Sequence, residues 1–210
     1  MIKIENINYS GYEAAIRGMR MPFKSHDKSD SLFYADGTFS LGEQDVELSK
    51  KLIRGGSEHR KFLRFIHISM DITAPSYWIA EQDTYKVATA RNSSSFMHIG
   101  MKKEFTLNDF TINNEILKDA DVLGLLNNTI ETINNLRNKY NKTYNFDYFE
   151  SIRQLLPSGY NYTYTYDCSM ETLLNMCKQR HGHRLPEWRE FIAIMIDRVP
   201  YFREWYNCLK

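Results

Sequence analysis

The stretch RFIHISMDITAPSYWIAEQD, from Arg64 to Asp83, decides the fold expected for this chain. Its apolar residues alternate with polar ones along the first half: Ile66, Ile68, Met70 and Ile72. This alternation predicts a strand with one buried face. Pro75 ends the strand, since proline has no amide hydrogen to donate to a neighbouring strand. Residues 76–88 then predict a helix with Ser76 as its N-cap, or, as the alternative, a continuation of the strand.

A very different segment follows, YKVATARNSSSFMH, from Tyr85 to His98. It has few large apolar residues and contains three consecutive serines. Hydroxyl and amide groups can satisfy phosphate oxygens or base edges without carrying charge, so this segment is a candidate wall of a nucleotide pocket. A solvent-exposed, serine-rich loop without a ligand is the alternative.

Helical patterns recur along the rest of the chain, at residues 11–20, 43–56, 120–140, 146–156, 169–180 and 186–206. Within 120–140 the apolar residues recur at spacings of three and four, which indicates an amphipathic helix. A hairpin is expected around Asp36-Gly37 and a loop at 21–31. The pattern predicts a single α+β domain over residues 1–210. We expect a small mixed or antiparallel sheet packed with several helices, and a helical lobe at 106–145.

The composition narrows the class of protein. The chain has 210 residues, 42% of them hydrophobic, which is enough for one substantial core. Its net charge of +1 gives no basic field for general nucleic-acid binding. No apolar run could span a bilayer, and the N-terminus lacks a signal-peptide core. Three cysteines without a CxxC motif fit a reducing compartment, so we expect a cytoplasmic protein.

The segment YNYTYTYD, residues 160–167, has the composition of a strand but also suits a loop. In a strand its four tyrosines would share one face: Tyr160, Tyr162, Tyr164 and Tyr166. That face could be an aromatic platform for a base. It could equally be the buried face of the strand, and we expect at least two of the four tyrosines to be buried.

Two other clusters carry weaker signals. His181 and His183 stand two residues apart in RHGHR, but no cysteine or carboxylate lies at a recognised zinc spacing, so we assign no metal site. Ser94 or Ser95 could pair with His98, but no nucleophile elbow frames them. We therefore assign no catalytic residue.

Three stretches, in order, resemble the flavin-dependent thymidylate synthases over residues 40–205. In IRQLLPSGYNYTYTYDCSMETLLNMCKQRHGHRLPEWREF, Arg153 precedes Pro157 by four residues, and Arg180 and Arg189 follow in the positions of two family arginines. In GGSEHRKFLRFIHISMDITAP, the Glu58-His59 pair precedes a strand and an Ala-Pro. The third stretch is the serine-rich segment. The chain is also similar to a group of uncharacterised phage and prophage proteins.

The resemblance also implies which residues bind the flavin and the nucleotide. In that family the third stretch holds the flavin and the deoxyuridylate phosphate, and the histidine lies beside the flavin, which would give this role to His59. One alignment register places Gln82, Asn92 and Ser95 on family positions, and a shift by one places Lys86 and Ser94. The nucleotide-binding residues implied or inferred nearby are Gln82, Tyr85, Lys86, Arg91, Asn92, Ser94, Ser95, Lys178, Arg180 and Arg189.

The chain departs from the family where an Arg-His-Arg triplet would stand. Thr84-Tyr85-Lys86 or Tyr85-Lys86-Val87 occupies that place. The guanidinium of arginine binds phosphate through two parallel hydrogen bonds, a geometry that lysine cannot reproduce. Each lost charge-assisted contact costs about 1.5–3 kcal/mol. We therefore expect catalysis to be lost or changed and FAD binding to be in doubt.

Three functions remain open. The first is a nucleotide-binding protein without the family's catalysis, such as a phage protein that sequesters a nucleotide signal of host defence. The second is an active flavin-dependent methyltransferase acting on deoxyuridylate. The third is a protein-binding inhibitor of a host enzyme, with GYEAAIRGMRMPF, residues 11–23, as an exposed docking helix. The resemblance also implies a homo-oligomer, a dimer or a tetramer.

Overall fold

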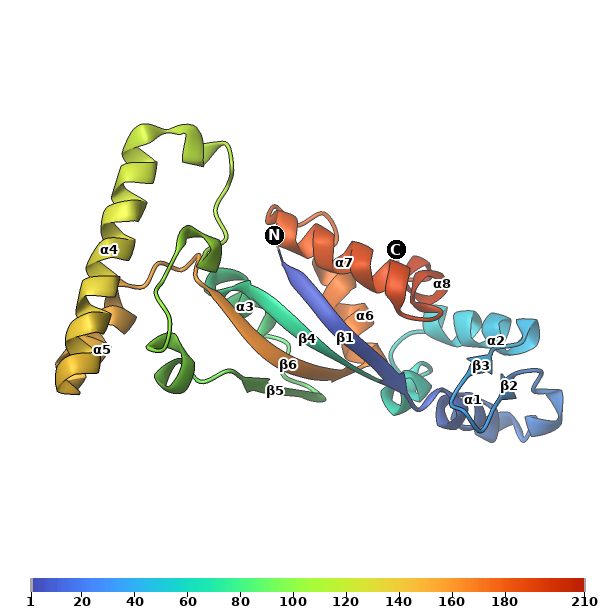
Figure 1. Cartoon of the computed structure of the whole chain (residues 1–210). Coiled ribbons are helices and arrows are strands. Elements are labelled where there is room, and N and C mark those ends of the chain that lie inside the picture. The colour runs from blue at the N-terminus through green and yellow to red at the C-terminus, as the bar shows by residue number, and fades with distance from the viewer. Residues whose placement is uncertain (1, 210) are drawn as a thin grey trace. The chain divides into compact units, whose positions relative to one another are not determined.

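The computed structural model describes residues 2–209, apart from the side chain of His98. It is an α+β fold with a four-stranded sheet, as expected (Figure 1). The strand order is β1-β4-β6-β5. The bounds are Lys3–Ser10 for β1, His67–Pro75 for β4, Asn161–Ser169 for β6 and Thr89–Ser93 for β5. A separate hairpin pairs β2, Leu32–Phe33, with β3, Phe39–Ser40.

The helices follow the order of the chain. Their bounds are Tyr12–Arg20 for α1, Glu43–Arg54 for α2, Ser76–Gln82 for α3, Ala120–Thr143 for α4, Phe146–Leu155 for α5, Met170–Gln179 for α6, Pro186–Arg198 for α7 and Phe202–Asn207 for α8. Short 3-10 turns occupy Met21–Phe23, His26–Lys28, Lys61–Phe65, Leu107–Asp109 and Ile116–Lys118, and a π turn occupies Phe96–Gly100. Within the described range, no helix combines the length and the apolar character needed to cross a bilayer.

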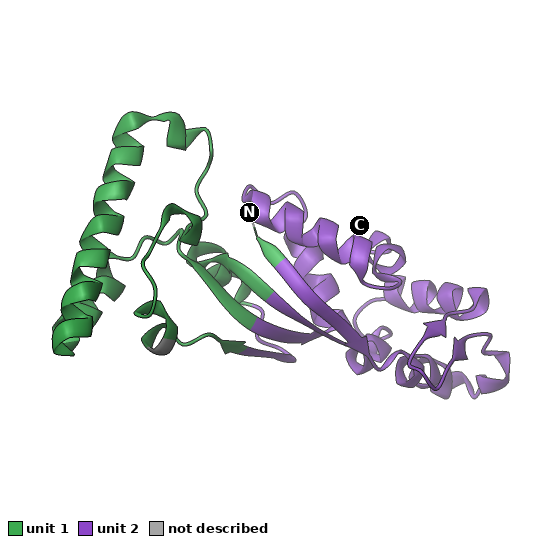
Figure 2. Ribbon diagram, viewed as in Figure 1, with its two compact units in different colours: residues 1–3, 72–84, 92–164 green, residues 4–71, 85–91, 165–210 purple. Residues whose placement is uncertain are grey.

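The chain divides into two compact units (Figure 2). Unit 1 contains residues 2–3, 72–84 and 92–164. Unit 2 contains residues 4–71, 85–91 and 165–209. The boundary falls within β1, β4, β5 and β6, so each strand of the four-stranded sheet contributes residues to both units.

In unit 1, α4 and α5 lie side by side and share a buried cluster (Figure 1). The amphipathic pattern of 120–140 is confirmed, because Ile130 and Ile133 are buried against Phe149 and Ile152. The side chain of Asn134 anchors the preceding loop by exchanging two hydrogen bonds with the backbone of Phe105, both at 2.9 Å. These contacts hold residues 101–105 against α4.

The core of unit 2 is aromatic. The ring of Tyr12 stacks on Phe39 at 4.3 Å and on Trp205 at 5.9 Å between centroids. The indole Nε1 of Trp205 donates a hydrogen bond to the hydroxyl of Ser49 at 2.8 Å, so its polar atom is satisfied inside the core. Gly11 connects β1 to α1 with a φ of 85°, and a Cβ there would lie 1.9 Å from the carbonyl oxygen of Phe65. Only glycine fits that approach.

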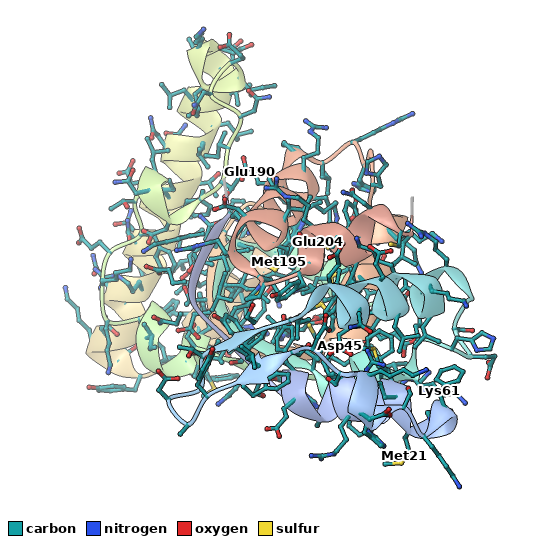
Figure 3. The ribbon with its side chains drawn as sticks, turned by 90° about the vertical axis from the view of Figure 1, so that its right-hand side faces the viewer. Met21, Asp45, Lys61, Glu190, Met195 and Glu204 are labelled. Atoms are coloured by element: carbon teal, nitrogen blue, oxygen red, sulfur yellow. The ribbon has the colours of Figure 1, made fainter. Side chains whose placement is uncertain are left out.

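A buried carboxylate organises the loop of residues 21–31. Asp45 lies on the side of α2 that faces α1 (Figure 3) and is fully buried. Its Oδ1 accepts from Nε of Arg20 at 2.5 Å, and its Oδ2 accepts from the hydroxyls of Ser29 at 2.7 Å and Ser31 at 2.6 Å. Burial by itself raises the pKa of Asp45, but the hydrogen bonds from Ser31, Ser29 and Arg20 outweigh it and hold the pKa below its ordinary value.

Three helix boundaries differ from the sequence-based expectations. Pro75, not Ser76, occupies the N-cap of α3, while the hydroxyl of Ser76 donates to the carbonyl oxygen of Ser158 at 2.8 Å. That helix also ends at Gln82 rather than continuing to residue 88. The single helix expected at 186–206 is broken into α7 and α8 around Pro200, since proline cannot donate the helical hydrogen bond.

Replacing Asp45 with asparagine is expected to lower the free energy of unfolding by about 3 kcal/mol or more, because Arg20 would remain as an unpaired buried charge. Urea denaturation measures the loss. The matched control is Glu47→Gln, which breaks the exposed ion pair with Lys50 and should cost less than about 1 kcal/mol. Equal losses in the two variants would contradict this account.

The stability contributed by Asp45 is expected to disappear in acid. Because its folded pKa lies below an unfolded value of about 4, the contribution is complete above that pH. It declines as the pH falls through the lowered folded pKa. Urea midpoints of the wild type and Asp45→Asn, compared between about pH 7 and about pH 3, should therefore converge on acidification. A difference that stays constant over this range would refute the assignment.

Candidate functional site

A cavity of about 280 Å³ lies in unit 1, and the serine-rich segment forms part of its wall. The other walls come from β4, from residues 160–163 at the start of β6, and from residues 96–109. Its lining consists of Thr73, Ser94, Ser95, Phe96, Ile99, Gly100, Lys103, Asn108, Asp109, Tyr160, Asn161, Tyr162 and Thr163. Hydroxyl, amide and aromatic groups dominate this set.

Strand pairing positions the two serines. The amide of Ser94 donates to the carbonyl oxygen of Thr163 at 3.0 Å, directly after β5 ends. The hydroxyls of Thr73 and Thr163 lie 2.8 Å apart on the neighbouring strands β4 and β6. Ser95 then stands at the N-cap of the π turn, which brings Phe96 over the same cavity. Two of the sequence-predicted residues, Ser94 and Ser95, are thus neighbours in one pocket.

Aromatic rings form one wall of the cavity. Phe96 meets Tyr160 edge to face at 5.8 Å, and Tyr160 meets Tyr162 in the same way at 4.9 Å between centroids. Burial and then the charge of Asp109 raise the pKa of Tyr160 to about 12. Burial also raises the pKa of Tyr162, against the lowering influence of Arg153. Both phenols therefore stay protonated near neutral pH and can donate hydrogen bonds to a ligand.

The four tyrosines of residues 160–166 differ in their burial. Tyr164 and Tyr166 are buried in the core, with 2% and 3% of their surface exposed. Tyr160 and Tyr162 are half-buried and line the cavity. The expectation that at least two of the four are buried is confirmed, and the other two are available to a ligand.

The cavity carries one cation and one anion, which neutralise each other. The Nζ of Lys103 lies 2.6 Å from Oδ1 of Asp109. Burial raises the pKa of Asp109, but the hydrogen bonds from Lys103 and Thr106 outweigh it and lower the pKa overall. With this pair intact, the lining suits an uncharged ring with hydrogen-bonding edges better than a phosphate.

The other predicted residues of unit 1 lie elsewhere. Asn92 is exposed on β5. Gln82 ends α3 and is fully buried, where its Oε1 accepts a short hydrogen bond from the hydroxyl of Tyr164. Its Nε2 has no hydrogen-bond partner among the described residues. Gln82 therefore ties α3 to the buried face of β6.

In unit 2, three of the predicted residues, Tyr85, Arg180 and Arg189, are connected through Arg180 and His183. The guanidinium of Arg180 lies over the rings of Tyr85 and Trp188, at 5.7 and 5.1 Å from their centroids. Its Nε donates to the hydroxyl of Tyr85 at 3.1 Å, and its Nη1 lies 3.1 Å from Nε2 of His183. Arg189 donates to the carbonyl oxygen of His183 at 3.2 Å. This cation–π cluster holds Arg180 in a fixed orientation.

The remaining predicted residues of unit 2, Lys86, Arg91 and Lys178, are exposed. The ring of His181 places Nδ1 at 2.9 Å from the hydroxyl of Tyr206. Across the described part of the chain, no three His, Cys, Asp or Glu side chains gather as metal ligands would.

His59 lies in a different part of unit 2, on a second cavity of about 260 Å³. Its amide donates to the carbonyl oxygen of Gly56 at 3.1 Å in a turn after α2. The residues lining this cavity are mostly apolar, and the one lysine among them, Lys61, pairs with Glu58 at 3.6 Å. No arginine is among these lining residues, so the cavity lining does not offer the bidentate hydrogen bonds that suit the diphosphate of FAD.

Sequence reasoning missed part of the first cavity. Lys103, Asn108 and Asp109 come from a segment without clear hydrophobic periodicity. The sequence signal in this segment is the capping box formed by Thr106 and Asp109. The predicted set is also divided between the units. Gln82, Asn92, Ser94 and Ser95 belong to unit 1, and the others belong to unit 2.

No family model matches the chain, and neither does any curated protein. Solved structures do match. Thymidylate synthase X (ThyX) from Helicobacter pylori, with FAD and dUMP, is 16% identical over 100% of both chains, with a TM-score of 0.70. The UMP/dUMP methylase PolB from Streptomyces cacaoi, bound with 5-Br dUMP, is 14% identical over 99% of this chain and 94% of its own, with a TM-score of 0.68. This protein has the fold of the flavin-dependent thymidylate synthases.

Proposed function

We propose that this protein binds a nucleotide or a nucleotide-derived small molecule and does not carry out the catalysis of the flavin-dependent thymidylate synthases. The observation that carries the proposal is the cavity of unit 1, where Ser94 and Ser95 meet Tyr160 and Tyr162. Tyrosine rings can stack on a base, and the surrounding hydroxyl and amide groups can read its edges. The nucleotide ligands of the two structural relatives support the same choice of ligand class.

The lost arginines are the argument against the family's catalysis. Where the family has an Arg-His-Arg triplet, this chain has Tyr85 and Lys86. Tyr85 is held by Arg180 and by Gln179, whose Oε1 accepts from its hydroxyl at 3.2 Å. Lys86 is a single exposed point charge. Neither residue replaces a bidentate grip on the phosphates of a flavin and a nucleotide.

A binding protein of this kind would need only the pocket. We propose that it sequesters a nucleotide or a nucleotide signal, as a phage protein would do to counter host defence. The proposal includes a single α+β domain with a helical lobe at 106–145, a cytoplasmic location and a homo-oligomeric state, a dimer or a tetramer. Arg180 and Arg189, with Lys86, Arg91 and Lys178, are its candidate phosphate contacts.

The alternative is an active flavin-dependent enzyme that methylates deoxyuridylate. The observation in its favour is the full-length likeness to ThyX with FAD and dUMP, together with the retained His59. Flavin binding separates the two candidates, because sequestration of a nucleotide does not require a flavin.

Replacing Tyr162 with alanine is expected to weaken nucleotide binding by about fivefold to a hundredfold, because stacking on a base contributes about 1–3 kcal/mol. Titration calorimetry with deoxyuridylate and a panel of nucleotides and nucleosides measures the change. Tyr144→Ala is the control, since Tyr144 is 79% exposed and does not line the cavity. The proposal fails if no member of the panel binds, or if both variants bind like the wild type.

The purified protein is expected to be colourless and to ignore added FAD, because the arginines that would grip the phosphates are missing. Absorbance in the flavin bands after purification, and again after incubation with FAD and gel filtration, tests this. A yellow protein with stoichiometric flavin would support the enzyme instead and would count against the loss of catalysis.

A further inference from the structure

A cavity of about 260 Å³ lies in unit 2, where the β2–β3 hairpin meets the junction between β1 and α1 (Figure 1). Five of its ten lining residues are aromatic: Tyr9, Tyr12, Phe33, Tyr34 and Phe39. The other five are two glycines, a serine, a threonine and one acidic residue, Glu13. The lining therefore combines aromatic rings with a single carboxylate.

The inner rings of this cavity are held in place by the core. Tyr12 is buried, and its hydroxyl donates a hydrogen bond to the carbonyl oxygen of Pro200 at 2.8 Å. The ring of Phe39 stacks on Tyr12 at 4.3 Å and on Phe33 at 6.0 Å between centroids. Rings that are already oriented lose little conformational freedom when a ligand binds.

The first turn of α1 can support these rings because the apolar face of the helix is buried. That face consists of Tyr12, Ala15, Ile16 and Met19. Its burial corrects the expectation that residues 11–23 form an exposed docking helix, since the helix cannot offer this face to a partner. Instead α1 contributes Tyr12 and Glu13 to the cavity.

Two tyrosines form the more exposed walls. Tyr9 is 42% exposed, and Tyr34 is 55% exposed. The ring plane of Tyr9 makes an angle of 84° with Phe39 and of 82° with Tyr12. Rings at right angles form a corner, and a corner can present more than one aromatic surface to the same ligand.

The hairpin turn fixes the backbone that carries Tyr34. The amide of Tyr34 donates to the carbonyl oxygen of Thr38 at 2.9 Å, and the amide of Gly37 donates to the carbonyl oxygen of Tyr34 at 3.0 Å. Oδ1 of Asp36 accepts from the amide and the hydroxyl of Thr38, at 2.9 and 2.7 Å. These bonds do not involve the side chain of Tyr34, so the ring can be replaced without breaking them.

The electrostatics of the cavity favour a cation. The face of an aromatic ring carries partial negative charge. Glu13 adds a full negative charge, and no lysine, arginine or histidine is among the lining residues. A phosphate would meet a carboxylate here without any cation in the lining to offset it.

We propose that this cavity binds a small organic cation that carries a methylated ammonium group. The rings contact the methyl groups, and Glu13 supplies the opposite charge. Attraction of a quaternary ammonium to several aromatic rings is a known mode of recognition in proteins. A quaternary ammonium also has no N–H donor, so its burial among rings leaves no hydrogen bond unmade.

The size of the cavity sets the size of the ligand. Sites for drug-sized molecules measure about 300–1,000 Å³, and this cavity lies just below that range. A group with the dimensions of choline is therefore the expected occupant. The inference does not depend on the proposed nucleotide site, because every residue that carries it lies in unit 2 and none lines the cavity of unit 1.

The test uses the full chain and two ligands of the same shape. One is choline, and the other is its neutral isostere, in which a tert-butyl group replaces the trimethylammonium. Amide chemical shifts of Gly37 and Thr38 are followed by NMR at constant ionic strength, balanced with sodium chloride. We expect choline to bind with a Kd of about 1 mM or tighter, and the isostere to bind at least about tenfold more weakly.

Variants of the exposed ring locate the binding. Tyr34→Ala should weaken choline binding by about twofold to thirtyfold, whereas Tyr34→Phe, which keeps the ring, should bind nearly as the wild type does. Tyr144→Ala is the control, since Tyr144 is 79% exposed and does not line the cavity. Thermal unfolding should be nearly unchanged in all three variants, because both tyrosines are exposed.

A second pair of variants tests the carboxylate. Glu13→Gln should weaken choline binding by about threefold or more and reduce its dependence on salt. Glu43→Gln is the matched control, because Glu43 is also exposed and also lies in the first turn of a helix of unit 2. Both variants remove the same interaction with a helix dipole, and only Glu13 lines the cavity.

Several outcomes would overturn the proposal. One is that choline causes no saturable shift of these amides, or that the isostere binds as tightly as choline. Another is that Tyr34→Ala stays folded and keeps the affinity of the wild type. Binding of a trimethyl-lysine peptide without binding of choline would identify a partner protein instead. A nucleotide that shifts the amides of Gly37 and Thr38 would place an anion here and contradict the electrostatic argument.

Discussion

The pairing of β5 with β6 is the constraint on which the candidate pocket depends. A hydrogen bond from the amide of Ser94 to the carbonyl oxygen of Thr163 brings a serine-rich segment beside a strand of tyrosines. Because side chains of a strand alternate between its faces, the register decides which groups can meet across the pair. The π turn that follows Ser95 then adds Phe96 to the same cavity. A polar bend with no motif of its own thereby becomes one wall of a shaped pocket.

Several charged side chains of this protein are paired at short distances. Asp45 is held by Arg20, Asp109 by Lys103, and Glu171 by Arg60 and Arg64. Arg180, a candidate phosphate contact, lies over the rings of both Tyr85 and Trp188. Such pairing stabilises local structure, and a guanidinium that is already engaged has fewer donors left for the phosphates of a large cofactor.

The fold is retained although only 16% of the residues match the Helicobacter pylori enzyme. A core accepts many substitutions if its volume and apolar pattern are kept, whereas a phosphate site depends on a few side chains of fixed geometry. In this chain Ile66, Ile68, Met70 and Ile72 are completely buried and preserve the central strand. The sequence contains no Arg-His-Arg triplet. Fold and chemistry can therefore diverge, and function has to be argued from the site.

The sequence by itself determined the elements with strong periodicity. The alternation of Ile66 to Ile72 and the three-four spacing of α4 predicted a strand and a helix correctly, because burial on one face imposes those periods. It also indicated that Ser94 and Ser95 could line a pocket. Only the tertiary structure decided that Tyr160, Tyr162, Lys103 and Asp109 share that cavity, and that Glu13 and Tyr34 line another. These facts depend on contacts between segments distant in the chain, and local periodicity carries no information about such contacts.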